Sequence, residues 1–219
     1  KYAGVDKTNG LPMWYADTYQ LDDKGDRVLD KDGNPIVTGR ETTTDYSAAT
    51  EYLCDNPTPI LYGGFGTSLS FYGFDVAAQF TYSIGGLTYD SGYASLVGAP
   101  SQPGYNVHVD VLNAWSETNK DSDMPRYQYL DENINGTSDR FLVDASYLNI
   151  QNVQVGYTLP QRLTQKMKIS RIRLSVSCDN VFYWSYRKGL DPRYSFTGST
   201  NYANNSPVRT ISGGLSITF

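Results

Sequence analysis

The chain has 219 residues, about the length of one domain, and is rich in Gly, Tyr and uncharged polar residues. Charged residues make up only 19% of it, which excludes a helix-rich protein because helices favour Ala, Leu, Glu and Lys. An aromatic content of 14% with a net charge of −5 excludes a disordered tail, and the acidic balance argues against nucleic-acid binding.

Residues 1–59 form a long polar stretch, which we expect to be a connection. Two Asp-rich segments in it, Asp22–Asp26 and Asp30–Asn34, invite a calcium interpretation. Neither has the EF-hand spacing of carboxylates, Gly and Glu, and Asp-Gly and Gly-Asn pairs are common in turns. We therefore predict turns at both places.

A hairpin is predicted next. Apolar and small polar residues alternate through residues 61–71 and again through Phe74–Ile84, where Phe74, Val76, Ala78, Phe80, Tyr82 and Ile84 share one face. This period of two is typical of strands with unlike faces. Only Tyr72-Gly73 separates the two segments, so they read as antiparallel strands joined by a tight turn.

Three more strands are predicted after a long connection at about 87–140, in which 109–116 has helix-like spacing. The first, at about 141–159, changes parity, and a β-bulge near Gln151-Asn152 would reconcile its two halves. A short link with a turn of helix around Leu163–Met167 leads to a strand at Arg171–Ser185. A connection at 187–208 then precedes the last strand, which alternates up to Phe219.

The placement of charges and connections points to a membrane barrel. In the four regular strands every charged residue falls on the polar face: Asp75, Arg171, Arg173 and Asp179. A lipid-facing surface and a soluble core would both require this. The connections discriminate, because all the long ones fall at one end of the strands and the short ones at the other, as in outer-membrane barrels. Since about eight strands are needed for closure, we expect other strands from a longer polypeptide.

Aromatic residues concentrate where the strands would meet the membrane interfaces. Phe182, Tyr183, Trp184 and Tyr186 lie at the outer end of one strand, and Phe71, Tyr72, Phe74, Tyr157 and Phe219 lie at the inner level. Aromatic girdles flank the apolar band of outer-membrane barrels. Ordinary core packing is the alternative for these rings.

Several motifs resemble one transporter family. Residues 144–160 read DASYLNIQNVQVGYTLP, residues 177–184 read SCDNVFYW, and KGLDP and PVRTI follow before the aromatic-terminated strand. Together they resemble the C-terminal portion of SusC-like (SusC/RagA family) TonB-dependent outer-membrane transporters. The fold class expected is therefore all-β: a transmembrane antiparallel β-barrel, to which this chain contributes about the last five of 22 strands and long extracellular loops.

The resemblance also implies a function and partners. Residues 1–59 would be an extracellular loop region, and 60–219 would form barrel strands with extracellular loops at about 87–140 and 187–208. The protein would import oligosaccharides or peptides across the outer membrane of a Gram-negative bacterium. Its partners would be the rest of the barrel and plug, a SusD-like surface lipoprotein, the TonB complex and lipid. A soluble carbohydrate-binding β-sandwich is the alternative.

Individual residues receive roles on this basis. Phe219 resembles the aromatic signal for outer-membrane assembly. Five loop aromatics are candidates for contact with cargo or with the lipoprotein lid, and internal packing is the alternative for each: Trp14, Tyr15, Trp115, Tyr127 and Tyr129.

The sequence offers no catalytic or metal-binding motif. His108 is the one histidine, and Cys54 and Cys178 are too far apart for zinc-type spacing. There is no nucleophile elbow and no Gly-rich phosphate loop. We expect no enzyme activity, no metal and no cofactor.

Overall fold

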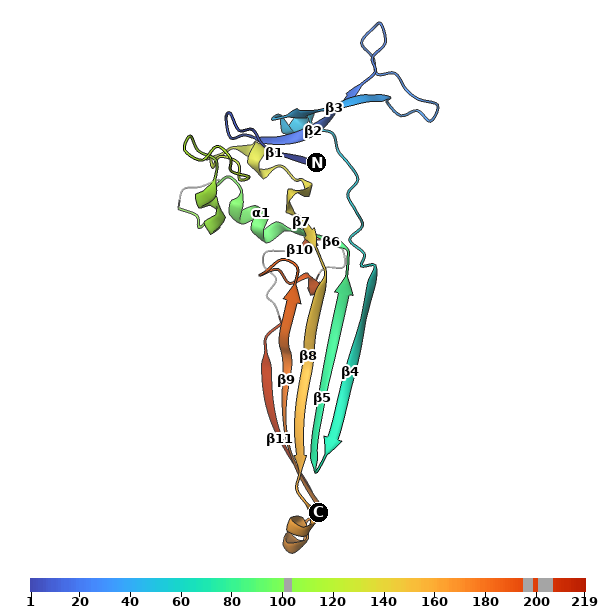
Figure 1. Ribbon diagram of the computed structural model, residues 1–219, viewed down its shortest axis with the longest axis vertical. Helices are drawn as coiled ribbons and strands as arrows, with labels where there is room; N and C mark the ends of the chain where they lie inside the picture. Colours follow the sequence, from blue (N-terminus) through green and yellow to red (C-terminus); the bar gives the residue numbers. More distant parts are fainter. Residues whose placement is uncertain (101–103, 195–198, 201–206) are drawn as a thin grey trace. The chain divides into compact units, whose positions relative to one another are not determined.

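The computed structural model describes residues 1–100, 104–194, 199–200 and 207–219. The chain divides into two compact units, one formed by 1–54 with 89–142 and the other by 55–88 with 143–219 (Figure 1). The described part is mainly β-structure, and none of its helices has the length and hydropathy needed to cross a bilayer.

The first unit contains a small sheet that the sequence analysis did not anticipate. Its strands pair antiparallel in the order β1 (Tyr2–Val5), β2 (Pro12–Tyr19), β3 (Val37–Thr43). The helical segments of this unit are η1 (Tyr46–Ala48), α1 (Ser91–Val97), η2 (Val109–Asn113), η3 (Glu132–Asn135) and η4 (Asp139–Phe141). Buried apolar side chains form its core: Val5, Trp14, Ala16, Val97, Ile134 and Phe141.

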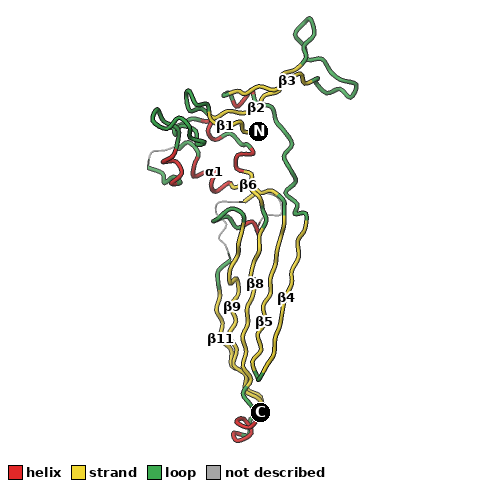
Figure 2. Tube along the Cα trace, viewed as in Figure 1, coloured by secondary structure: helices red, strands yellow, loops and turns green. Residues whose placement is uncertain are grey.

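The second unit is built on one antiparallel sheet of five strands, ordered β11-β9-β8-β5-β4 (Figure 2). The strands are β4 (Leu61–Phe71), β5 (Phe74–Ile84), β8 (Tyr147–Thr158), β9 (Arg171–Ser185) and β11 (Thr210–Thr218). The predicted hairpin and the strand at 171–185 are confirmed. The strand expected at about 141–159 is shorter, since Leu142–Asp144 forms a separate strand, β7. A further small sheet has the order β10 (Ser199–Thr200), β6 (Leu87–Asp90), β7.

The connections at the two ends of the five-stranded sheet differ as expected. Tyr72-Gly73 joins β4 to β5, and a link with helical turns α2 (Gln161–Thr164) and η5 (Gln165–Met167) joins β8 to β9. Both short links lie at the same end of the sheet. Phe74, directly after the turn, pairs with Tyr157, and Thr158, at the end of β8, pairs with Arg173. The longer connections leave from the opposite end.

The hairpin turn has the backbone that a two-residue loop requires. Tyr72 has φ 47° and Gly73 has φ 86°, and positive φ at both positions is typical of a type I′ turn, whose twist matches that of the strands. A Cβ atom on Gly73 would lie 2.7 Å from the carbonyl oxygen of Thr158. Glycine is therefore required here by conformation and by space.

A β-bulge keeps the apolar residues of β8 on one face. Ile150 pairs with Phe80 and Asn152 with Gln79, which leaves Gln151 as the extra residue. This confirms the bulge predicted near Gln151-Asn152. Strand β9 has a matching irregularity that the sequence analysis missed, with Asn180 and Val181 lying between the paired residues Asp179 and Phe182.

Candidate functional site

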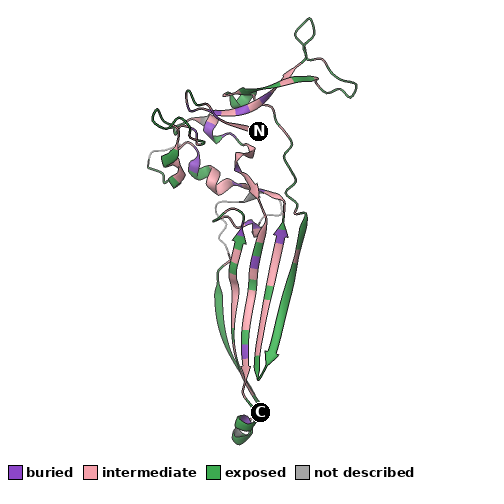
Figure 3. Ribbon diagram, viewed as in Figure 1, coloured by how far each residue is buried: buried purple, intermediate pink, exposed green. Residues whose placement is uncertain are grey.

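One face of the five-stranded sheet is apolar and open. Figure 3 shows strands β4 and β11 as exposed along almost their whole length. On the inner strand β9, Val176 and Trp184 are each 55% exposed, and Leu69 on the edge strand β4 is 62% exposed. This degree of exposure means that no described segment of the second unit packs over this face. A β-sandwich would cover it with a second sheet.

The apolar face has the height of a bilayer's hydrocarbon band. Strand β5 has 11 residues, which at about 3.4 Å per step gives about 34 Å along the strand. Barrel strands tilt by about 40°, so β5 would cross about 26 Å of membrane, and the apolar band of such barrels is about 25 Å tall. The strand length therefore matches a single crossing.

Both edges of this sheet are open within the described residues. Strand β4 pairs only with β5, and β11 pairs only with β9. Each edge thus presents a row of backbone N–H and C=O groups to its surroundings. Such an edge needs a neighbouring strand, above all in lipid, where no water is present to satisfy it.

The predicted inner aromatic level is assembled from three strands. The ring centroids of Phe71 and Phe74 lie 5.9 Å apart, and those of Phe74 and Tyr157 lie 4.4 Å apart. Tyr72 in the adjoining turn is 97% exposed, and Phe219 after β11 is 87% exposed. These rings sit at the end of the sheet with the short connections.

The outer aromatic cluster is split between the two faces. Phe182 pairs with Ile150 and Trp184 with Leu148, so both lie on the apolar face, and Tyr186 beyond them is 69% exposed. Tyr183 instead lies on the polar face, where the guanidinium of Arg193 stands 4.7 Å from its ring centroid. A position of Tyr183 at the membrane interface therefore stays a prediction.

The opposite face of the sheet carries cross-strand polar pairs, as the charge pattern predicted. Arg173 on β9 forms an ion pair with Asp75 on β5, with a further Nε–Oδ1 hydrogen bond of 3.2 Å. Asn152 donates to Asp179 over 2.7 Å. This face of the sheet therefore carries charged and amide groups.

The chain after β9 folds back onto this polar face. Arg193 donates from Nη1 to Asn149 Oδ1 over 2.9 Å and forms a two-pronged ion pair with Asp191. Asn149 is only 4% exposed, and its amide donates to Thr81 over 3.2 Å. The Arg193 side chain therefore ties this connection to β8 and β5.

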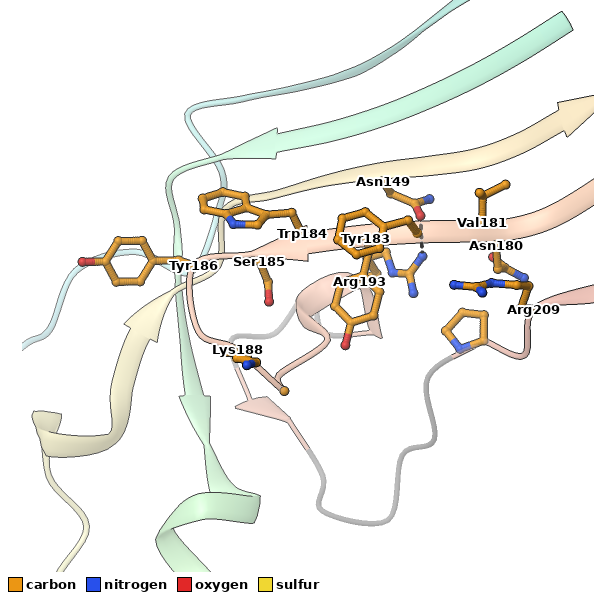
Figure 4. Close-up of a pocket in the computed structure, with 13 residues that line it drawn as sticks. Asn149, Asn180, Val181, Tyr183, Trp184, Ser185, Tyr186, Lys188, Arg193 and Arg209 are labelled. Atoms are coloured by element: carbon orange, nitrogen blue, oxygen red, sulfur yellow. Dashed lines mark hydrogen bonds between the residues drawn. The ribbon is translucent and has the colours of Figure 1, made fainter. Parts of the chain in front are cut away.

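A pocket of about 600 Å³ opens beside Arg193 (Figure 4). Its lining comes from Asn149 on β8, from residues at the C-terminal end of β9 and just after it, and from Pro207 and Arg209 just before β11. Its polar lining consists of Asn149, Asn180, Tyr183, Ser185, Lys188, Arg193 and Arg209. Three of its lining side chains are positive: Lys188, Arg193 and Arg209.

The predicted contact aromatics of the first unit occupy different environments. Trp14 is 2% exposed with its ring 5.1 Å from that of Tyr46, which favours the internal-packing alternative. Trp115 donates from Nε1 to the carbonyl of Lys7 over 3.2 Å. Tyr127 is 38% and Tyr129 51% exposed, so their rings remain accessible.

Tyr15 adjoins a charged group in the small sheet. The guanidinium of Arg40 lies 5.7 Å from the Tyr15 ring centroid and 4.6 Å from that of Tyr52. Arg40 also pairs with Asp17 over 3.1 Å. The hydrogen bond from Tyr52 to Asp17, and then Arg40, hold the pKa of the Asp17 carboxyl below its usual value.

The two Asp-rich segments are turns, as predicted. Asp22 accepts from the backbone N–H groups of Lys24 and Asp26, each over 2.9 Å. Asp30 accepts in the same way from Asp32 and Asn34. Within the described ranges, no cluster of His, Cys, Asp or Glu is arranged to hold a metal.

No protein-family model matches the chain. The chain is 28% identical to TonB-dependent receptor P3 of Formosa agariphila; this match covers the whole chain and 21% of the receptor. It is 22% identical to TonB-dependent receptor P26 of the same organism; this match covers 89% of the chain and 20% of the receptor. Among solved structures, the RagAB peptide transporter superimposes over the whole chain and 22% of its own, with a TM-score of 0.77 and 27% identity. The RagAB peptide importer in its open-open state gives a TM-score of 0.70 and 26% identity.

The chain thus spans about a fifth of the length of the relatives it matches. Their names describe receptors and transporters rather than enzymes. The resemblance carried by the sequence motifs is confirmed: the chain is similar, in sequence and in fold, to part of a SusC-like TonB-dependent transporter.

Proposed function

We propose that the five-stranded sheet is a section of a 22-stranded β-barrel wall in the outer membrane of a Gram-negative bacterium. The apolar face would meet lipid and the polar face would line the lumen. The remaining strands would come from a longer polypeptide and would pair with the open edges of β4 and β11. On this proposal residues 60–219 contain the wall, and residues 1–59 and the longer connections lie outside the cell.

The observation that carries this proposal is the uncovered apolar face. Side chains such as Val176 and Leu215, 55% and 62% exposed, would cost free energy in water at about 25 cal/mol per Å² of apolar surface. Hydrocarbon tails remove that cost without any further protein layer. The polar pairs on the reverse side then fit a wet interior.

We further propose that the protein imports peptide or oligosaccharide nutrients. RagAB, to which the chain is similar, is a peptide transporter, and a related cargo is the simplest expectation. The energy would come from the TonB complex through a plug domain, and a SusD-like lipoprotein would cover the outer opening. The exposed Tyr127 and Tyr129 are then candidates for contact with cargo or lid.

Thiol labelling in isolated outer membranes tests the orientation of the sheet. Cys54 and Cys178 are first replaced by Ser, and single cysteines are then placed on β9. We expect Ser175→Cys and Ser177→Cys to react with a water-soluble maleimide, and Val176→Cys to stay protected until the protein is denatured. Equal labelling on both faces, or protein in the soluble fraction, would contradict a barrel wall.

Uptake measurements test the transport role separately. Deleting the gene should reduce the accumulation of either a labelled peptide mixture or a labelled oligosaccharide mixture. A protonophore should cause the same loss, because TonB-driven transport depends on the proton gradient. Unchanged uptake of both mixtures in the deletion strain would refute the import role.

A further inference from the structure

The short link between β8 and β9 is basic and carries no compensating acid. Arg162, Lys166 and Lys168 lie in it, and all three are exposed. Residues 160–171 contain no Asp or Glu. Among the described residues, none of the three side chains takes part in an ion pair. In a chain with a net charge of −5, these positive charges are available to an anionic surface outside the chain.

The helical turns of the link gather part of this charge on one side. The turn α2 continues directly into η5, and Arg162 and Lys166 are four residues apart, so their side chains are neighbours on the helical surface. Leu163, three residues before Lys166, is 53% exposed. Thr164 is only 1% exposed and marks the inward side. The outward side therefore combines two cations with one apolar side chain.

The link begins at the depth expected for lipid headgroups in the proposed barrel wall. Tyr157 belongs to the inner aromatic level, and Leu159, two residues later, still donates to the carbonyl of Ile172 over 3.0 Å. Two strand steps at a tilt of about 40° cover about 5 Å of depth, and a headgroup layer is about 5–8 Å thick. Ser170 donates to the carbonyl of Thr218 over 2.8 Å, which holds the other end of the link at the end of β11. Figure 2 shows the helical turns beyond the ends of the strands.

We propose that this basic link binds the headgroups of anionic phospholipids in the periplasmic leaflet of the outer membrane. The inference rests on the proposed barrel wall and adds the class of lipid that its inner end prefers. Lys and Arg side chains close to an anionic membrane surface are attracted by its phosphate groups. The exposed Leu163 meets the acyl boundary while the long side chains of Arg162 and Lys166 reach the phosphates. The aromatic rings at the same end of the sheet continue this contact with the interface.

Quenching of tryptophan fluorescence by brominated lipids tests the link in the full-length protein. Leu163→Trp places one reporter in the link, and Val176→Trp places another on the apolar face of β9. The vesicles contain three parts phosphatidylcholine and one part phosphatidylglycerol, and one of the two lipids at a time is brominated on its acyl chains. After subtraction of the signal of the parent protein, the two quenching values give the relative association constant of the lipids at each reporter. Arg162→Gln and Lys166→Gln are combined with Leu163→Trp, and Lys188→Gln, after β9 at the opposite end of the sheet, is the matched control for loss of one positive charge.

We expect the reporter at position 163 to favour phosphatidylglycerol and the reporter at position 176 to favour neither lipid. Arg162→Gln and Lys166→Gln should each reduce the preference about two- to fivefold, as for the loss of one cation near an anionic surface. High salt should reduce it as well, because it screens exposed charges. Lys188→Gln should leave the preference unchanged.

Three results overturn the inference while the barrel wall stands, provided that the reporter at position 176 is quenched. These are an equal preference at positions 163 and 176, an unaltered preference in both link variants, and a loss with Lys188→Gln as large as theirs. Absence of quenching at position 163 alone also overturns it, because the link would then lie away from lipid and its charges would serve a soluble acidic partner. Absence of quenching at position 176 would refute the barrel wall itself, and the inference with it.

Discussion

Arginine substitutions along β9 should show a gradient of destabilisation that reports depth in the membrane. Cys178, Val176, Leu174 and Ile172 succeed each other on the apolar face at two-residue steps. Each step is about 7 Å along the strand and about 5 Å in depth at a tilt of about 40°. In the proposed barrel Cys178 would lie in the middle of the apolar band, and Ile172 would lie about 16 Å from it toward the short-loop end, at the interface.

The expected magnitudes follow from that geometry. Arginine facing lipid costs about 2–4 kcal/mol at the bilayer midplane and about 0–1 kcal/mol near the interface. Cys178→Arg should therefore reduce the ratio of folded to unfolded protein by about 30- to 1,000-fold. Val176→Arg and Leu174→Arg should fall between Cys178→Arg and Ile172→Arg. Ser177→Arg, on the polar face of the same strand, should change stability by at most about 0.5 kcal/mol.

The assay is equilibrium unfolding in guanidinium of the full-length protein in lipid vesicles, with the amount in the outer membrane measured in parallel. Because the five variants add the same side chain to one strand, differences among them reflect only face and depth. A flat profile from Cys178 to Ile172, or a cost at Ser177 equal to that at Cys178, would refute the assignment of the apolar face to lipid.

Three further predictions concern single residues. Since the folded pKa of Asp17 is lowered, its carboxylate stabilises the fold above the usual Asp pKa and this contribution is lost as the pH falls through the folded pKa. Asp17→Asn should thus lower the unfolding temperature at pH 7, and the unfolding temperatures of variant and wild type should become equal in acid. A lower unfolding temperature of the variant at pH 2 would contradict this mechanism. Gly73→Ala should destabilise by more than about 1 kcal/mol in denaturant titration because of its positive φ and the close carbonyl, whereas Tyr72→Asn should be tolerated. Phe219→Asp should reduce assembly in the outer membrane, and unchanged surface labelling would argue against an assembly signal.

Local patterns in the sequence were sufficient for the strands of the large sheet. The alternation in Phe74–Ile84 assigned every side chain to a face, because a strand turns its side chains over at each residue. The parity change at Gln151 marked the bulge for the same reason. The turn at Tyr72-Gly73 was identified by its length. Each of these features is encoded within about a dozen neighbouring residues.

The small sheet of the first unit could not be predicted in this way. Strand β2 pairs with β3 across the two Asp turns, and its sequence, PMWYADTY, carries apolar or aromatic residues on both faces. The long-range contacts of this sheet include buried Trp14 against Tyr46 and the ion pair between Asp17 and Arg40. These contacts join segments more than 20 residues apart and leave no periodic trace in the sequence.

The sequence by itself determined which residues form the five-stranded sheet and which face of it is apolar, because both depend on a period of two along each strand. The tertiary structure alone decided that this face is uncovered and that Lys188, Arg193 and Arg209 line one pocket beside Asn149. All three residues lie in the connection between β9 and β11, and its position beside Asn149 depends on the register of β8, β9 and β11. Register is a property of paired strands, so no single stretch of the chain contains it.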